Sequence, residues 1–92
     1  MTIAVLGAGA WGTALASVLA ERNDVPVVLW AKRRELSDAI NSAHENARYL
    51  PGIMLPANLA CTHDLAAALH GTSMVVFVVP SHSMREVARA AS

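Results

Sequence analysis

The chain has 92 residues, of which 54% are hydrophobic and 15% are charged, and its formal net charge at pH 7 is zero. This length allows one domain at most, and the apolar content excludes a disordered chain. The balanced charge excludes a global field that would attract nucleic acid, and the single cysteine excludes an internal disulfide and fits a reducing compartment.

The uncharged segment 1–20 has two other interpretations, a secretory signal and a membrane helix. A signal peptide needs a positive region before its apolar core, whereas the first basic residue here is Arg22. A membrane helix needs a sustained apolar run, and glycines and hydroxyl side chains interrupt this one. We therefore expect a cytoplasmic protein that does not insert into a membrane.

Residues 3–30 predict a strand, a helix and a second strand. Residues 3–6 are apolar, partly β-branched and followed by glycine, which is typical of a strand buried in a parallel sheet. Residues 12–22 are rich in alanine and leucine and predict the helix, and residues 27–30 form the second apolar run. The helix also has apolar residues at helical spacing: Trp11, Leu15, Val18 and Leu19. Such a unit makes the two strands parallel.

The rest of the chain alternates in the same way, less regularly. The expected elements are a helix over 35–42, a loop over 44–58, a strand over 59–62, a helix over 64–69, a strand over 74–79 and a helix from Ser83 onward. About four strands alternating with helices predict an α/β fold with a Rossmann-type, doubly wound parallel sheet. A complete sheet of this type has about six strands. Residues 1–92 are therefore expected to be a partial N-terminal dinucleotide-binding domain, with apolar surface at its open edge.

Three glycines between the first strand and the first helix have the pattern G-x-G-x-x-G: Gly7, Gly9 and Gly12. In this context the pattern predicts a dinucleotide-binding turn. The first glycine permits the tight turn, the second lets a pyrophosphate approach the backbone, and the third lets the helix pack on the strand. Free N–H groups of the first helical turn, around Ala10, then face the phosphates. The alternative is a glycine-rich turn that binds nothing.

Three consecutive cations follow the second strand: Lys32, Arg33 and Arg34. An NAD site usually has an acidic residue about twenty residues past the glycines, where it accepts hydrogen bonds from the ribose 2′-hydroxyl. Here no acid precedes Glu35, and the cations suit a 2′-phosphate. The sequence therefore favours NADP(H), with NAD(H) still open. The alternative is a solvated charge run at a helix start.

The remaining candidate side chains carry weaker signals. Trp11 lies between two of the glycines and can pack over the cofactor or in the core, and Tyr49 lies in the long loop, where binding residues concentrate. His82 lies between two serines, but no acid is placed to orient it, and Ser83 is better explained as a helix cap. The histidines and Cys61 lack metal-ligand spacing. We therefore expect neither hydrolytic catalysis nor a metal site.

Several segments together resemble the opening of NAD(P)-dependent glycerol-3-phosphate dehydrogenases, the bacterial form most closely. They occur in the family's order over essentially the whole chain: Gly7–Ala16, Leu29–Arg33, His44–Gly52, Asp64–Leu69 and Val79–Ser81. The tryptophan among the glycines, combined with the Tyr-Leu-Pro loop, is far more specific than the glycines alone. The resemblance implies an enzyme that interconverts sn-glycerol 3-phosphate and dihydroxyacetone phosphate by hydride transfer, for phospholipid synthesis.

The resemblance also implies roles for individual residues. Ala10 and Trp11 would contact the cofactor near its phosphates, Lys32 and Arg33 would hold its adenosine end, and Tyr49 would line its pocket. Position 10 is often serine in relatives, so a hydroxyl contact is lost here while the backbone N–H remains. The cation at position 32 varies in the family, which keeps NAD and NADP both open.

The family's catalytic lysines and its helical substrate-binding domain would lie beyond residue 92. Residues 1–92 are therefore expected to hold no catalytic residue and to be inactive alone, and the small-molecule substrate would bind through the other domain. A homo-oligomer is compatible with the parent protein. Two alternatives stay open: another reductase of the 6-phosphogluconate or ketopantoate type, and a dinucleotide-sensing or interaction module without catalysis.

Overall fold

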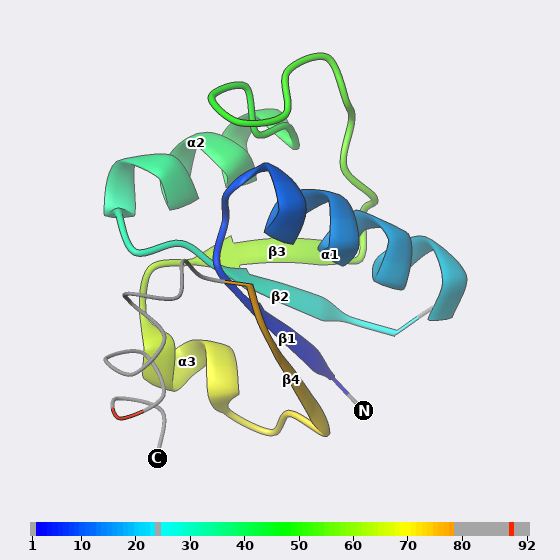
Figure 1. Ribbon diagram of the computed structural model, residues 1–92, viewed down its shortest axis with the longest axis vertical. Coiled ribbons are helices and arrows are strands. Elements are labelled where there is room, and N and C mark those ends of the chain that lie inside the picture. Colours follow the sequence, from blue (N-terminus) through cyan, green and yellow to red (C-terminus); the bar gives the residue numbers. More distant parts are fainter. Residues whose placement is uncertain (1, 24, 79–88, 90–92) are drawn as a thin grey trace.

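The computed structural model describes residues 2–23, 25–78 and 89 and shows strands alternating with helices (Figure 1). The elements in chain order are β1 (Ile3–Leu6), α1 (Ala10–Asn23), β2 (Val27–Trp30), α2 (Arg34–Ala43), β3 (Leu59–Thr62), α3 (Leu65–Leu69) and β4 (Met74–Phe77). The expected α/β class and the alternation of elements are confirmed.

The four strands form one parallel sheet in the order β3-β2-β1-β4. In the register of the sheet, Leu6 pairs with Trp30 and with Phe77, and Trp30 pairs with Thr62. The last residues of all four strands are therefore aligned. Every segment that follows a strand starts at the same edge of the sheet, where ligands of open α/β sheets bind.

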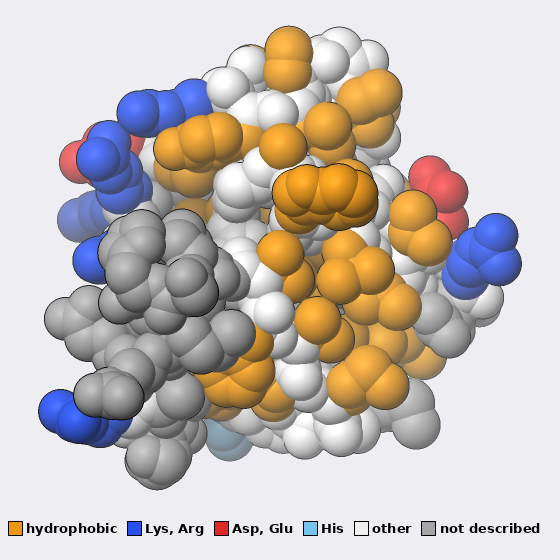
Figure 2. Space-filling view, in the orientation of Figure 1, with side chains coloured by type: hydrophobic (Ala, Val, Ile, Leu, Met, Phe, Trp, Pro, Cys, Tyr) orange, Lys and Arg blue, Asp and Glu red, His pale blue; other side chains and the backbone are white. Residues whose placement is uncertain are grey.

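Helices cover both faces of the sheet: α1 and α2 lie on one face and α3 on the other (Figure 1). The side of α1 that meets the sheet carries small residues, because Thr13, Ala16 and Ala20 are buried there. Of the larger apolar side chains that indicated the helix, Leu19 packs against the buried cluster, whereas Trp11 and Val18 are exposed. Figure 2 shows hydrophobic side chains gathered over the outward face of the molecule where α1 runs.

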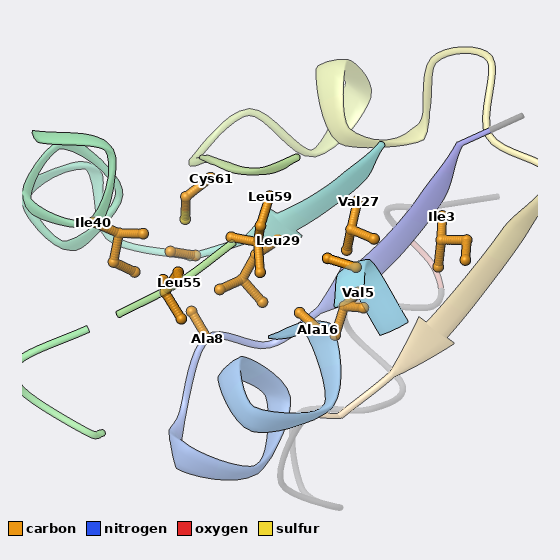
Figure 3. Packing of buried hydrophobic residues seen from close by; sticks show 12 residues of the cluster. Ile3, Val5, Ala8, Ala16, Val27, Leu29, Ile40, Leu55, Leu59 and Cys61 are labelled. Carbon is orange, nitrogen blue, oxygen red and sulfur yellow. The ribbon is translucent and has the colours of Figure 1, made fainter. Parts of the chain in front are cut away.

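Apolar side chains fill the space between the sheet and the first two helices (Figure 3). Val5 and Leu29 are fully buried at the centre of this cluster, and Ile40 reaches it from α2. A smaller cluster on the opposite face contains Trp30 and Ala68 of α3. A sheet packed on both faces explains why its two central strands read as unbroken apolar runs.

The bounds of several elements differ from those expected. Helix α1 starts at Ala10, two residues before the expected start at residue 12. Strand β4 ends at Phe77, short of residue 79, and residue 79 and most of the expected last helix lie outside the described residues. As an edge strand, β4 exposes Met74 and Phe77. Among the described helices, none has the length and apolarity needed to cross a membrane.

Candidate functional site

The turn between β1 and α1 requires glycine at two positions for internal reasons. Gly7 has a φ of 128°, in a region that side-chain-bearing residues rarely adopt. A Cβ on Gly12 would overlap the carbonyl oxygen of Gly7. The N–H of Gly7 donates a 3.1 Å hydrogen bond to the carbonyl of Trp30, so the turn begins against the end of β2. The contact between position 12 and the carbonyl of Gly7 shows that the start of α1 lies directly against the turn.

Gly9, the middle glycine, has a different environment. Among the described residues, and apart from Gly9 and its two chain neighbours, no heavy atom lies within 4 Å of the place that a Cβ on Gly9 would occupy. Its carbonyl accepts a 3.0 Å hydrogen bond from the N–H of Thr13, which closes the first turn of α1. The preceding N–H groups of a helix have no acceptor within the helix, and they form the positive end of its dipole. This open space beside a helix N-terminus can hold an anion such as a pyrophosphate.

A buried amide side chain forms hydrogen bonds with the glycine turn from the interior of the fold. Asn46 has no exposed surface, and its Nδ2 donates to the carbonyl oxygen of Ala8 at 2.8 Å and to Oγ1 of Thr13 at 2.7 Å. Thr13, also fully buried, donates from its hydroxyl to the same carbonyl at 3.4 Å. The sequence did not reveal this contact, because Asn46 lies in the long loop, far along the chain from the turn that it contacts.

The same asparagine positions Tyr49, which was expected to line the cofactor pocket. Its Oδ1 accepts a 3.3 Å hydrogen bond from the N–H of Tyr49, and its carbonyl accepts a 2.7 Å bond from the N–H of Leu50. The guanidinium of Arg48 lies 5.4 Å from the centre of the Tyr49 ring. Asn46 therefore links the Tyr49 loop to the glycine turn.

Trp11 is 82% exposed, so core packing, one of its two expected interpretations, is wrong for the described structure. It lies in the first turn of α1, beside Ala10, which is also exposed. A large aromatic side chain beside an open helix N-terminus is available to cover a bound ligand. Exposure therefore favours the other interpretation of Trp11, packing over a cofactor.

The basic residues follow β2 at the same edge of the sheet. Lys32 and Arg33 are exposed, and Arg33 precedes the first turn of α2 in extended conformation without capping it. Arg34 lies within the helix, where its Nε is 3.7 Å from a carboxylate oxygen of Asp38. Within the described part of the chain, no ion pair is found for Lys32 or Arg33. Two of the three cations are therefore free to meet an anion.

An open hollow of about 780 Å³ lies beside α2. Its lining comes from the exposed side of that helix and from the loop that follows it, and includes Arg33, Leu36 and Arg48. Gly9, Trp11 and Tyr49 do not line it. Of the three consecutive basic residues after β2, Arg33 alone is among the residues that line it.

Two further expectations concern chemistry away from the turn. Among the described residues, no group of three histidine, cysteine, aspartate or glutamate side chains could hold a metal ion.

Burial raises the pKa of the Cys61 thiol to about 11, against smaller lowering effects of hydrogen bonds from Thr62, Ser37 and Ala31. This thiol is a core residue and a poor nucleophile. His82 and Ser83 lie outside the described residues.

Comparison with known proteins gives one consistent result. The family model described as NAD-dependent glycerol-3-phosphate dehydrogenase N-terminus matches residues 2–92. A relative from Stenotrophomonas maltophilia, named glycerol-3-phosphate dehydrogenase [NAD(P)+], is 54% identical over 88 residues, which are 96% of this chain and 26% of the relative. A relative of the same name from Xanthomonas euvesicatoria is 54% identical over 87 residues, or 95% of this chain and 25% of the relative.

Solved structures agree with this result. Glycerol-3-phosphate dehydrogenase from Coxiella burnetii superposes with a TM-score of 0.87 at 43% identity, over 94% of this chain and 26% of that chain. The Saccharomyces cerevisiae enzyme gives a TM-score of 0.89 at 31% identity, over 98% of this chain and 29% of that chain. The chain spans about a quarter of the length of the curated relatives it matches. It belongs to the NAD-dependent glycerol-3-phosphate dehydrogenase family and corresponds to the N-terminal, NAD-binding part of those proteins.

Proposed function

We propose that these residues form the cofactor cradle of a dehydrogenase that interconverts sn-glycerol 3-phosphate and dihydroxyacetone phosphate by hydride transfer. The observation that carries the proposal is the glycine turn. Gly7 and Gly12 are required by the protein's own backbone, whereas no described residue beyond its chain neighbours fills the space beside Gly9, in front of a helix N-terminus. A vacant approach at that point suits a pyrophosphate.

The residues around the turn then have distinct binding roles. The N–H groups of Ala10, Trp11 and Gly12 receive the phosphate charge, and the Trp11 and Tyr49 side chains shield the ligand from water. When bound, the nicotinamide supplies the hydride chemistry. The chain's own contribution is to bind the cofactor and fix its orientation.

We further propose that Lys32 and Arg33 favour NADP(H) over NAD(H). Both side chains are exposed at the carboxyl edge of the sheet, next to the strand that ends in the glycine turn. A 2′-phosphate adds negative charge that a guanidinium can hold with two hydrogen bonds. The names of the relatives, which include both cofactors, are compatible with either preference.

The setting of the reaction belongs to the same proposal. The small-molecule substrate and the catalytic groups are assigned to segments outside residues 1–92, in an enzyme of the cytoplasm that supplies phospholipid synthesis and that can form a homo-oligomer. The buried, unpaired Cys61 is compatible with a reducing compartment.

Two proteins are needed to test the enzymatic function. The full-length protein is expected to reduce NAD(P)+ when supplied with sn-glycerol 3-phosphate, and residues 1–92 alone are expected to show no turnover because they lack the substrate site. The measurement is the absorbance of the reduced nicotinamide over time. Dinucleotide binding by the full-length protein without turnover of any glycerol phosphate would favour the alternative of a dinucleotide-sensing module.

A further inference from the structure

The buried side chain of Asn46 makes three hydrogen bonds. Placing an amide in the interior is unfavourable unless its hydrogen bonds are satisfied. Its Nδ2 group satisfies two acceptors, the Ala8 carbonyl and the Thr13 hydroxyl, and its Oδ1 accepts from the N–H of Tyr49. All of these partners belong to the glycine turn, the start of α1 or the Tyr49 loop. The amide is therefore at the junction of three parts of the candidate site.

The bond to Ala8 fixes the direction of a donor on the other side of the same peptide unit. A trans peptide is planar, so its C=O and the following N–H point in opposite directions. No cis peptide bond occurs in the described residues. Because the Ala8 carbonyl is held toward Asn46 in the interior, the N–H of Gly9 points away from Asn46. The position of this donor therefore depends on Asn46.

From this geometry we propose that Asn46 is a positioning residue for dinucleotide binding. It holds the Ala8–Gly9 peptide in the orientation that presents the Gly9 N–H to a pyrophosphate, and it places the Tyr49 loop beside that turn. This inference rests on the proposed cofactor-binding function. Asn46 acts through Gly9 and Tyr49 and is not itself assigned a contact with the cofactor.

Asn58 provides a matched control within the same chain. Its Nδ2 also donates to two backbone carbonyls, those of Ala20 at 2.8 Å and Val25 at 2.9 Å. These contacts join the end of α1 to the segment before β2, at the amino end of the strands and away from the glycine turn. Removing the Asn46 amide breaks three side-chain hydrogen bonds and removing the Asn58 amide breaks two, but of these two residues only Asn46 contacts the glycine turn.

The first test compares Asn46→Ala with Asn58→Ala in the full-length protein. Both variants are expected to unfold at lower temperature. At a temperature where each is folded, Asn46→Ala is expected to weaken dinucleotide binding by about tenfold or more, and Asn58→Ala by less than about twofold. In steady-state kinetics, Asn46→Ala is expected to raise the KM for dinucleotide and to leave the KM for glycerol phosphate unchanged. Calorimetric titration with NADPH and NADH gives the affinities.

A gentler pair keeps the test decisive if Asn46→Ala does not fold. Thr13→Val removes the hydroxyl that accepts from Asn46 and keeps the shape of the side chain, whereas Thr13→Ser keeps the hydroxyl. The valine variant is expected to lose affinity by about threefold or more, and the serine variant is expected to bind as the wild type does.

The outcomes separate this inference from the proposed function. Equal loss of affinity in Asn46→Ala and Asn58→Ala, or equal affinity of the two Thr13 variants, overturns the positioning role while the wild type still binds dinucleotide. A wild-type protein that binds neither NADPH nor NADH overturns the proposed function and this inference together.

Discussion

At the scale of single residues, the three glycines of the G-x-G-x-x-G motif are subject to different structural constraints. Gly7 is fixed by its backbone angle and Gly12 by contact with the carbonyl of Gly7. Gly9 has neither constraint within the described part of the chain, since its φ is not in the left-handed region and no described residue beyond its chain neighbours fills the space of its missing side chain. For Gly9 we therefore propose that the reason for glycine is the bound pyrophosphate.

This difference predicts opposite behaviour of two alanine variants. Gly12→Ala is expected to lower the free energy of unfolding by roughly 2–4 kcal/mol, because the new Cβ meets backbone that cannot move aside. Gly9→Ala is expected to cost at most about 1 kcal/mol of stability, yet to weaken dinucleotide binding by about tenfold or more, because the methyl group stands where the pyrophosphate approaches. Chemical denaturation and ligand titration of both variants provide the comparison. Unchanged affinity in a stable Gly9→Ala variant would place the phosphates elsewhere.

The raised pKa of Cys61 predicts that the free energy of unfolding depends on pH. Burial raises its pKa from 9.0 to about 11 in the folded chain. The folded state therefore keeps the proton more strongly than the unfolded state does, so the thiol's contribution is complete below pH 9.0 and is lost as the pH rises to about 11. The expected loss is about 1–2 kcal/mol, reduced because the thiol is not fully desolvated.

Denaturation of wild type and of Cys61→Ser across this pH range measures the effect. The serine side chain does not titrate, and all other groups are common to both proteins. The variant is therefore expected to have the shallower decline in stability, and parallel declines would mean that the thiol ionises equally easily in the folded and unfolded chains.

At the scale of elements, the hydrophobic pattern of the sequence predicted the positions of the strands well. It predicted poorly which side of a helix is buried. Residues 27–30 match β2 because a parallel strand buried on two faces needs unbroken apolar side chains. Residues 59–62 match β3, an edge strand in which Leu59 and Cys61 are buried and Ala60 is exposed. The buried side of α1 was not predictable from hydrophobicity, because close packing against the sheet selects Thr13 and Ala16 over larger residues. The place of Asn46 was also beyond sequence reasoning, since its partners are more than thirty residues away in the chain.

The basic residues between β2 and α2 are expected to determine the cofactor preference. Lys32→Ala combined with Arg33→Ala is expected to weaken NADPH binding by about tenfold or more, through loss of charge-assisted hydrogen bonds, and to leave NADH binding nearly unchanged. Arg34→Ala is the control, since the adjacent Arg34 is engaged with Asp38 on the helix. Titrations with both cofactors decide the matter, and an NADPH preference that survives the double substitution would contradict a phosphate-binding role for this basic segment.

At the scale of the whole molecule, the described chain is a packed sheet with two edge strands, of which β4 exposes apolar side chains. β3 and β4 lie at the two edges, and β4 exposes Met74, Val75 and Phe77, whereas β1 is fully buried between its neighbours. Such an edge has unpaired backbone groups and apolar side chains that a further strand and its helix can cover. The fold and the glycine turn were predictable from sequence because they arise from local patterns. The site's assembly was not, because it depends on contacts between distant segments.

The overlap that a side chain at position 12 would make with the carbonyl of Gly7 has a consequence for how this protein can change over time. Substitution there is expected to disrupt the fold, so position 12 has almost no freedom to vary. Lys32 and Arg33 are exposed and have no such restriction. We therefore expect coenzyme preference to change in evolution, or by engineering, through substitutions at positions 32 and 33 while the glycine at position 12 is inherited unchanged.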